Sequence, residues 1–309
     1  MKEITVLMST YNGEKYILEQ LKSLENQKDV LINLFIRDDG STDNTVQIIK
    51  EYKTDKMKIE LISAENIGVR DSFIWLIKNC PYKTEYYAFC DQDDYWLEEK
   101  IISAIKFMDK DKEKIPKLYY SNIFVTDENL NIIAKSNYNN IKDILPVALT
   151  NNPATGCTIV FNIDLLEKIV FPEDYKIRMH DWWMYKVCIC IGGKIYKDEK
   201  SYIFYRQHEN NVVGATRKNS RVKQIYEFSK KIGYFSKEAK VLKNIYLNSI
   251  IDKEKLKKIE KVEKLTKLGT LKKFKVLFDK DFNIGSLKYT IQLKLAILIH
   301  KNKGDNNDE

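Results

Sequence analysis

Three aspartates stand within four residues, directly after an apolar run in the first third of the chain. The run covers residues 86–89, and the acids are Asp91, Asp93 and Asp94. Carboxylates this close raise one another's pKa unless a cation compensates for their charge. Hard oxygen ligands suit Mg²⁺ or Mn²⁺. The pattern therefore predicts a divalent-metal site at the end of a buried strand, which is where α/β sheets bind ligands.

The elements that must position this cluster alternate between strand and helix signals. Helical patterns separate four apolar, β-branched runs that are expected to form strands, at residues 4–8, 31–36, 59–62 and 86–89. The first two runs end in polar, glycine-containing segments. Alternation of this kind predicts an α/β fold, with a mostly parallel sheet and helices on both faces.

Beyond residue 96 the pattern is more mixed. Helices are expected over residues 101–108 and from His180 to residue 191, where Gly192 and Gly193 follow. The remaining apolar runs are expected to extend the sheet, at residues 118–125, 130–133, 155–161, 195–196 and 202–205.

Length and composition favour a globular protein with one large domain and an appendage. The 309 residues are 44% hydrophobic and 31% charged. No apolar run approaches the roughly 18 residues that span a bilayer, and the N-terminus lacks a signal-peptide profile. The five cysteines are scattered, without a C-x-x-C pair, and are expected to be reduced packing residues in a cytosolic protein.

Charge divides the chain into two parts. From Arg217 onward there are 24 basic and 11 acidic residues, a net charge of +13, whereas the part before it carries −5. Apolar residues in this tail recur at alternating steps of three and four from Ile225 to Tyr246, which predicts an amphipathic helix. Further helices are expected around residues 256–265 and 287–299, and residues 303–309 are expected to be disordered.

The polar segments resemble a known family. The segments 10–13, 38–43, 66–68 and 90–94 (T-Y-N-G, D-D-G-S-T-D, N-I-G and C-D-Q-D-D) occur in the order found in glycosyltransferase family 2, inverting enzymes of the GT-A fold. The later segments 156–158, 180–183 and 205–211 look like the bacterial branch, often labelled rhamnosyltransferases, that assembles capsule, O-antigen or cell-wall polysaccharide. The resemblance covers about residues 3–214. It implies a catalytic domain over 1–214; the tail is outside it, and its charge and periodicity predict a basic helical region over 215–309.

The resemblance implies a metal-dependent reaction in which an acceptor hydroxyl displaces a nucleoside diphosphate from an activated sugar. Asp91 and Asp93 resemble the D-x-D motif of the family, with Asp93 coordinating the metal and Asp91 shared between metal and ribose. His208 matches a further metal ligand. A nitrogen ligand beside carboxylates favours Mn²⁺ over Mg²⁺.

The same resemblance makes Asp181 the general base that activates the acceptor. It stands at the expected start of a helix, where the dipole favours the ionised carboxylate. Its pKa would have to be tuned by burial among Trp182 and Trp183. Either tryptophan would present a flat apolar face to the acceptor sugar.

Donor-binding residues carried over from the family complete the predicted site. Asp39 matches the family residue that hydrogen-bonds the nucleobase. The base is expected to be uracil or thymine, so a UDP- or dTDP-linked donor is expected. Tyr11 flanks that base and the Thr10 backbone lines it. Glycine at position 68 lets the backbone approach the donor. The set is completed by Asn66, Gln92 and Arg206, the last expected at the diphosphate.

The basic tail predicts the surroundings of the enzyme. A basic amphipathic segment can lie on an anionic leaflet, which would hold the protein peripherally at the inner face of the cell membrane near a lipid-linked glycan acceptor. The alternative is a solvated helical bundle or a coiled-coil homodimer.

Other classes of protein fit the sequence less well. A nucleic-acid-binding protein would explain the basic tail, but no motif for DNA or RNA is present and no nucleic acid is expected as a partner. A nucleotidyltransferase also uses paired acids and a metal, but it needs a basic, glycine-rich triphosphate loop where this chain has residues 10–14, T-Y-N-G-E. A catalytically dead relative would not need to retain all the acids.

Overall fold

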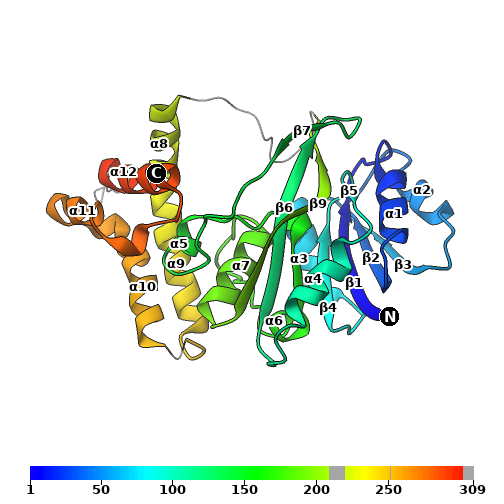
Figure 1. The fold of residues 1–309 in the computed structure, drawn as a ribbon, viewed down its shortest axis with the longest axis horizontal. Helices are drawn as coiled ribbons and strands as arrows, with labels where there is room; N and C mark the ends of the chain where they lie inside the picture. Colours follow the sequence, from blue (N-terminus) through cyan, green and yellow to red (C-terminus); the bar gives the residue numbers. More distant parts are fainter. Residues whose placement is uncertain (209–219, 251, 302–309) are drawn as a thin grey trace.

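A single sheet of nine strands runs through the middle of the computed structural model, which describes residues 1–208, 220–250 and 252–301 (Figure 1). The strands are β1 (Lys2–Thr10), β2 (Val30–Asp38), β3 (Met57–Ser63), β4 (Tyr86–Cys90), β5 (Tyr95–Trp96), β6 (Lys117–Thr126), β7 (Ile132–Lys135), β8 (Val160–Asn162) and β9 (Lys194–Arg206). Their order in the sheet is β3-β2-β1-β4-β8-β6-β9-β5, with β7 paired to β6.

The first four strands are parallel, so their carboxyl ends lie along one edge. β1 pairs with both β2 and β4, and β2 pairs with β3. In this register Thr10 lies beside Asp38, and Met8 lies beside Cys90. Beyond β4 the sheet continues through the antiparallel strands β8 and β6, and β9 is parallel to β6. The predicted α/β architecture is confirmed, and the segments 10–13, 38–43 and 90–94 all begin at the same edge.

Two cores form because successive strand residues point to opposite faces. Val6 and Met8 belong to one core, and Leu7 between them belongs to the other. Helices cover both faces: α1 (Ile17–Glu25) and α4 (Lys100–Met108) pack in the Val6 core, and α3 (Val69–Asn79) and α7 (His180–Cys190) in the Leu7 core. The shorter helices of this part are α2 (Thr45–Glu51), α5 (Val147–Thr150) and α6 (Ile163–Leu166).

In the described part of the basic tail, five α-helices lie at the end of the molecule away from β1–β3 (Figure 1). They are α8 (Arg221–Lys230), α9 (Ile232–Tyr246), α10 (Lys253–Glu263), α11 (Thr270–Val276) and α12 (Leu287–Ile299). Phe235 and Leu242 of α9 are buried in the same core as α7, and a fully buried ion pair joins Lys186 of α7 to Glu238 of α9. The division at residues 214 and 215 stays a prediction, and α9 packs as part of the main core.

Some elements differ from the sequence-based expectation. Residues 155–161 were expected to form one strand, but a single turn of 3₁₀-helix, Gly156–Thr158, precedes β8. The Thr158 hydroxyl and N–H both donate to the carbonyl oxygen of Thr155, at 2.7 and 2.9 Å, and this local bonding replaces the ladder. The stripe from Ile225 to Tyr246 is divided between α8 and α9 at Lys231, and α11 was not expected.

Two further expectations are that residues 303–309 are disordered and that no apolar segment is long enough to span a bilayer. Residues 303–309 lie outside the described residues. Among the residues that the structure describes, no helix is long and apolar enough to cross a bilayer.

Candidate active site

The segments after β1 and β2 are joined through Asp38. The Thr10 hydroxyl donates to Asp38 Oδ1 at 2.9 Å, and the Ser41 N–H donates to Asp38 Oδ2 at 2.9 Å. The Ser41 hydroxyl donates to Oδ1 at 2.5 Å, and the Asn12 N–H donates to that hydroxyl at 2.9 Å. The buried Asp38 carboxylate therefore holds both segments in place at the edge of the sheet.

Asp39 joins β2 to the turn that precedes α3. Its carboxylate is buried, pairs with Arg37, and accepts the N–H groups of Ile67 at 3.0 Å and Gly68 at 2.8 Å. Gly68 has φ of +84°, a conformation that favours glycine, and Asn66 beside it is exposed. The structure thus brings Asp39, Asn66 and Gly68 together. The contact of Asp39 with a nucleobase stays a prediction.

Gln92 holds the backbone of Tyr11 from the neighbouring strand end. The Tyr11 N–H donates to Gln92 Oε1, and Gln92 Nε2 donates to the Tyr11 carbonyl oxygen, both at 2.9 Å. A Cβ on Gly13 would lie 2.2 Å from Gln92 Oε1, so a larger residue there would displace the Gln92 side chain from Tyr11. The Tyr11 side chain is about half exposed. Gln92 therefore positions an aromatic ring at the edge where the nucleotide is expected.

Asp93 and His208 meet although they are 115 positions apart in the chain. Asp93 Oδ2 lies 2.8 Å from His208 Nε2, and both side chains are partly exposed. The His208 ring also lies beside the ring of Tyr16, with centroids 5.2 Å apart. The two strongest metal-ligand predictions are thus adjacent in space.

Arg206 is placed differently from the prediction that it contacts the diphosphate. Its guanidinium is 3% exposed and is turned into the protein. Nε donates to the Asp93 carbonyl oxygen at 2.9 Å, NH1 donates to the Glu128 carbonyl oxygen, and NH2 pairs with Glu19. Because these contacts use the fork of N–H donors inside the protein, Arg206 positions the loop that carries Asp93.

Asp181 lies in the first turn of α7 and close to the acid loop. Burial, with the nearby charges of Asp93 and Asp181, raises the pKa of Asp91 to about 7. Burial also raises the pKa of Asp181 to about 6. Gly156 of the 3₁₀ turn packs against Asp181, since a Cβ on Gly156 would be in ordinary contact with it, 3.5 Å from the Asp181 Cβ. Three carboxylates from two distant segments therefore share one site.

The raised pKa of Asp181 predicts a pH-dependent change in stability. Well below pH 4 the carboxyl is protonated in folded and unfolded chains, so it contributes nothing. As pH rises from about 4 to about 6, the unfolded carboxyl ionises while the buried one stays protonated, so the folded protein loses stability over this range and the loss levels off above pH 6. In metal-free solution, the free energy of unfolding of Asp181→Asn minus that of the wild type is expected to increase by about 3 kcal/mol from pH 3 to pH 8. Urea unfolding at several pH values measures this difference, and a pH-independent difference would contradict it.

Comparison with known proteins identifies the family. Residues 5–170, more than half of the chain, match the family model described as glycosyl transferase family 2. The chain belongs to glycosyltransferase family 2. It is 36% identical over 220 residues to the dTDP-rhamnosyl transferase RfbG of Shigella flexneri. The aligned region covers 67% of this chain and 74% of that protein. The predicted family and enzyme class are confirmed, and membership decides against the nucleotidyltransferase alternative.

Solved structures show the same fold for this glycosyltransferase. S. aureus TarS 1–349 in complex with UDP-GlcNAc has a TM-score of 0.59 and 18% identity, covering 96% of this chain and 90% of that one. The mannosyltransferase PcManGT from Pyrobaculum calidifontis in complex with GDP-Man and Mn²⁺ has a TM-score of 0.51 and 15% identity, covering 98% and 88%. The predicted GT-A fold, with a helical C-terminal region, is confirmed.

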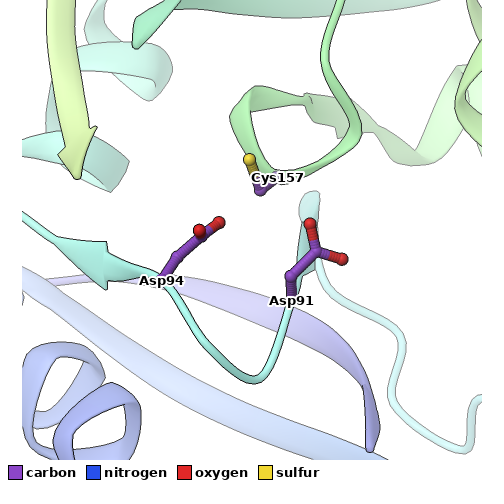
Figure 2. Close-up of side chains that lie close together, drawn as sticks. All are labelled: Asp91, Asp94 and Cys157. Carbon is purple, nitrogen blue, oxygen red and sulfur yellow. The ribbon is translucent and has the colours of Figure 1, made fainter. Parts of the chain in front are cut away.

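A further acid of the glycosyltransferase, Asp94, is buried beneath the site (Figure 2). Its carboxylate points toward Asp91 and the Cys157 thiol, and one potential ligand atom from each residue lies within 4.8 Å of the other two. Oδ1 accepts the Arg206 N–H at 3.3 Å, but Oδ2 has no hydrogen-bond partner among the described residues. Burial raises the pKa of Cys157 well above its ordinary value, so the thiol is protonated and a poor metal ligand.

Lys100 supplies a positive charge under this cluster, and the sequence analysis did not single it out. It is fully buried in α4, and its Nζ lies 3.3 Å from the centroid of the Trp96 ring, without a hydrogen-bond acceptor among the described residues. Burial lowers the pKa of Lys100 to about 8, opposed by Cys90, Cys157 and Asp94. A lysine four residues after Trp96 was the only sequence signal.

Removal of the buried Lys100 charge is expected to lower the affinity of the proposed metal site, although Lys100 is not a proposed ligand. Lys100→Met removes a buried positive charge that interacts with Asp94, and supporting residues near a metal site typically change metal affinity by about 10–100-fold. We expect a loss of this size in the apparent affinity for Mn²⁺ in the presence of a nucleoside diphosphate, measured by thermal shift. Lys106→Met, on the exposed side of α4, is the matched control and is expected to have no effect. Equal affinities for both variants would show that Lys100 only fills space.

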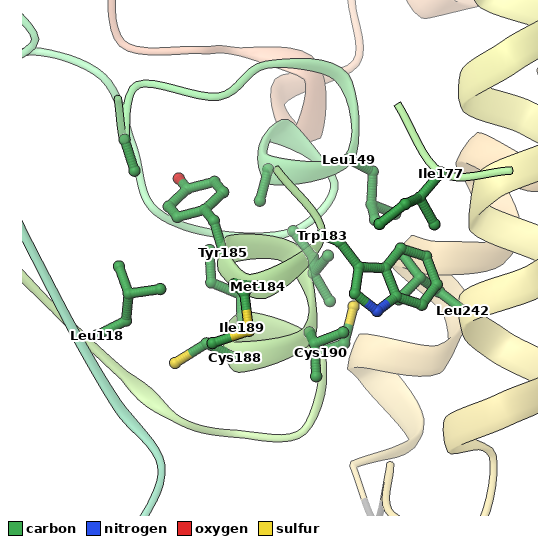
Figure 3. Packing of buried hydrophobic residues seen from close by; sticks show 14 of the residues in the cluster. Leu118, Leu149, Ile177, Trp183, Met184, Tyr185, Cys188, Ile189, Cys190 and Leu242 are labelled. Carbon is green, nitrogen blue, oxygen red and sulfur yellow. The ribbon is translucent and has the colours of Figure 1, made fainter. Parts of the chain in front are cut away.

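The two tryptophans of α7 have different environments, and one differs from the prediction. Trp183 is fully buried, faces Leu242 of α9, and donates its indole N–H to the Val170 carbonyl oxygen at 2.9 Å (Figure 3). The prediction that Trp183 binds the acceptor is therefore wrong, because its ring belongs to the core. Trp182 is partly exposed, with the Arg178 guanidinium 4.6 Å from its ring centroid, and stays the candidate for acceptor contact.

His180 precedes the predicted base but is a packing residue. Its ring stacks on Phe73 with centroids 4.0 Å apart and meets Phe89 edge-on at 4.6 Å. Burial lowers the pKa of His180 to about 3, so the ring is neutral at physiological pH. Asp181, with a pKa near 6, is thus the group at the start of α7 that can accept a proton reversibly.

Proposed function

We propose that this enzyme is an inverting, metal-dependent glycosyltransferase that moves a sugar from a nucleoside-diphosphate-sugar donor to a hydroxyl of a glycan acceptor. One observation carries the proposal. Asp91, Asp93 and Asp181 converge at the carboxyl edge of a parallel sheet, and burial and mutual repulsion raise the pKa of Asp91. Such an arrangement is costly without a ligand, and perturbed carboxyls of this kind mark functional sites.

A direct displacement fits the residues around this cluster. The acceptor oxygen forms a bond to the anomeric carbon, its proton passes to an Asp181 carboxylate oxygen, and the bond from that carbon to the diphosphate breaks. The nucleoside diphosphate leaves with the bonding electron pair, and a single displacement inverts the configuration. A carboxylate with a pKa near 6 is ionised at neutral pH and is a stronger base than an exposed aspartate.

The residues present fit a divalent cation. Asp93 and His208 are in contact, and burial and the neighbouring charge of Asp93 disfavour ionised Asp91 in the absence of a cation. The two carboxylates suit Mn²⁺ or Mg²⁺, and the imidazole nitrogen favours Mn²⁺. When bound, the cation would neutralise charge on the departing diphosphate. Arg206 holds the Asp93 backbone, and Lys100 compensates Asp94 from below.

The donor is proposed to be a dTDP- or UDP-linked hexose or deoxyhexose. The relative named dTDP-rhamnosyl transferase supports a deoxyhexose donor, and the TarS complex supports a uridine nucleotide in this fold. In this enzyme Asp39, Thr10 and Tyr11 would receive the base, with Asn66, Gly68 and Gln92 shaping the loops around it.

The acceptor is proposed to be a lipid-linked glycan in the synthesis of a bacterial surface polysaccharide such as capsule or O-antigen. The support is the family resemblance and the net charge of +13 in the part from Arg217 onward, which suits peripheral association with the inner, anionic face of the cell membrane. The coiled-coil homodimer remains the alternative for the tail.

A panel of nucleotides tests the proposal. Thermal unfolding of the full chain is followed with dTDP, UDP, GDP and their sugar conjugates, with and without Mn²⁺. Stabilisation grows with the logarithm of ligand concentration over Kd, so the preferred base and the metal requirement appear directly. We expect metal-dependent stabilisation by dTDP or UDP. The proposal fails if no nucleoside diphosphate raises the melting temperature in the presence of either metal.

A further inference from the structure

An apolar surface lies on the outermost helices of the tail. It consists of Leu271, Phe274 and Phe278 in and after α11 and of Leu287, Ile291 and Ile299 in α12, and is called here the α11–α12 face. Phe278 is 84% exposed, Leu271 82% and Leu287 76%. Single exposed apolar residues are ordinary on a protein surface, but six on two adjacent helices mark an interaction site.

The spacing on α11 shows that the exposure is patterned. Leu271, Phe274 and Phe278 follow steps of three and four and so lie on one side of the helical turn. Val276 faces the interior on the other side and is buried. A helix stabilised only by its own core would carry polar residues on its outer stripe. Its outer stripe is apolar instead.

α12 has the same property and lies beside α11. Leu293 and Ile297 are buried, whereas Leu287, Ile291 and Ile299 are exposed, so apolar residues occupy both sides of this helix. Lys294 Nζ donates to the Leu277 carbonyl oxygen at 2.8 Å, and Lys273 donates to the carbonyl oxygen of His300. These contacts pair the helices in opposite directions, as Figure 1 also shows them next to each other. A helix apolar on all sides is normally covered.

The charges around the face select the kind of partner. Between Thr270 and Lys301 the chain contains seven lysines and two acids, Asp279 and Asp281. Both acids pair with Lys261. Among the described residues, the exposed lysines at positions 272, 275 and 288 form no ion pair. An anionic partner with an apolar interior would satisfy both the lysines and the apolar side chains.

We propose that the α11–α12 face docks on an anionic lipid bilayer, with its apolar side chains among the acyl chains and its lysines at the headgroups. This deepens the proposed function, on which it rests for a membrane-bound acceptor. Basic helices with exposed Leu and Phe lie in the plane of such an interface. A second copy of the chain fits less well, because a symmetric contact would bring the same lysines against one another. A nucleic acid would leave the apolar residues without a partner.

Vesicle sedimentation of the full chain tests the docking surface. The wild type is expected to bind vesicles of phosphatidylcholine mixed with phosphatidylglycerol, to bind less at high salt, and not to bind pure phosphatidylcholine. Leu271→Ser/Phe278→Ser removes apolar area without changing charge and should weaken binding at least about tenfold. Leu271→Glu/Phe278→Glu should bind more weakly still. Ile132→Glu/Ile133→Glu, two exposed apolar residues of β7, is the matched control and should bind nearly as the wild type.

Other measurements separate the possible failures. All variants must keep the wild-type melting temperature and its metal-dependent shift with nucleoside diphosphate, since the substituted side chains are exposed. Vesicle binding unchanged in both double variants of Leu271 and Phe278 would overturn the assignment. So would light scattering that shows a wild-type dimer and monomeric variants, because the face would then join two copies. If the wild type shows no metal-dependent shift in melting temperature with nucleoside diphosphate, the proposed function is rejected. The vesicle experiment would then still decide whether the α11–α12 face binds lipid.

Discussion

Asp93→Ala is expected to abolish the stabilisation that a nucleoside diphosphate confers in the presence of Mn²⁺. Asp93 contacts His208 and lies close to Asp91, whose pKa is raised by burial and by the negative charge of Asp93. At a ligand concentration of about 100 times Kd, the wild type should gain about 2.7 kcal/mol in its free energy of unfolding, and the variant should gain almost none. Thermal or urea unfolding with and without metal measures both values.

Two further variants make the Asp93 experiment specific. Asp55→Ala removes an exposed aspartate between α2 and β3 and should keep the full metal-dependent gain. His208→Ala removes one of the proposed ligands and should weaken the response while leaving part of it. If Asp93→Ala retained the complete metal-dependent gain, the metal would bind elsewhere and the site as proposed would be misplaced.

Asp181→Asn is expected to bind donor and metal as the wild type does, but to transfer sugar about 10²–10⁴ times more slowly. The amide has nearly the shape of the carboxylate, yet it cannot take the acceptor proton. Because the proposed base acts on the acceptor, the nucleotide-induced shift in melting temperature should be unchanged. Release of nucleoside diphosphate in the presence of a hydroxyl acceptor measures the rate.

The pH dependence of sugar transfer gives a second test of Asp181 as the general base. With a pKa near 6, the carboxylate is ionised above that pH, so kcat/KM of the wild type should rise with pH through about 6 and then level off. The residual rate of Asp181→Asn should lack this step. Asp174→Asn, an exposed aspartate in the segment before α7, is the control and should retain the wild-type profile. Near-wild-type turnover by Asp181→Asn would remove this residue from the mechanism.

The strands and the acid loop could be predicted because they depend on neighbouring residues. Alternating apolar runs specify buried parallel strands, and a polar segment after each run must lie at the carboxyl edge. The parallel pairing of β1 with β2, which sets Thr10 beside Asp38, agrees with that expectation. The turn over Gly156–Thr158 could not be read in the same way, because side-chain bonding to Thr155 outweighed a β-rich composition.

The contacts among distant residues needed the tertiary structure. The Arg206 guanidinium is buried and pairs with Glu19, and no local pattern indicates that direction. Lys100 is a charged residue of a helix and would be expected on the surface, but it is buried and its Nζ lies over the Trp96 ring. Charge alone predicts exposure for such residues, and only packing reveals that they are buried.

The sequence by itself determined the class of fold, the family, and the group of acids with which the chemistry is proposed, since each resides in a short ordered segment. The tertiary structure decided which side chains position those acids or lie beside them. Adjacent residues on a helix point about 100° apart, so the sequence could not tell that Trp183 packs against Leu242 while Trp182 stays partly exposed. The tertiary structure also decided that α9 packs in the main core and that the α11–α12 face stays exposed. Burial depends on which surfaces meet in space and on how much apolar area each contact removes from water.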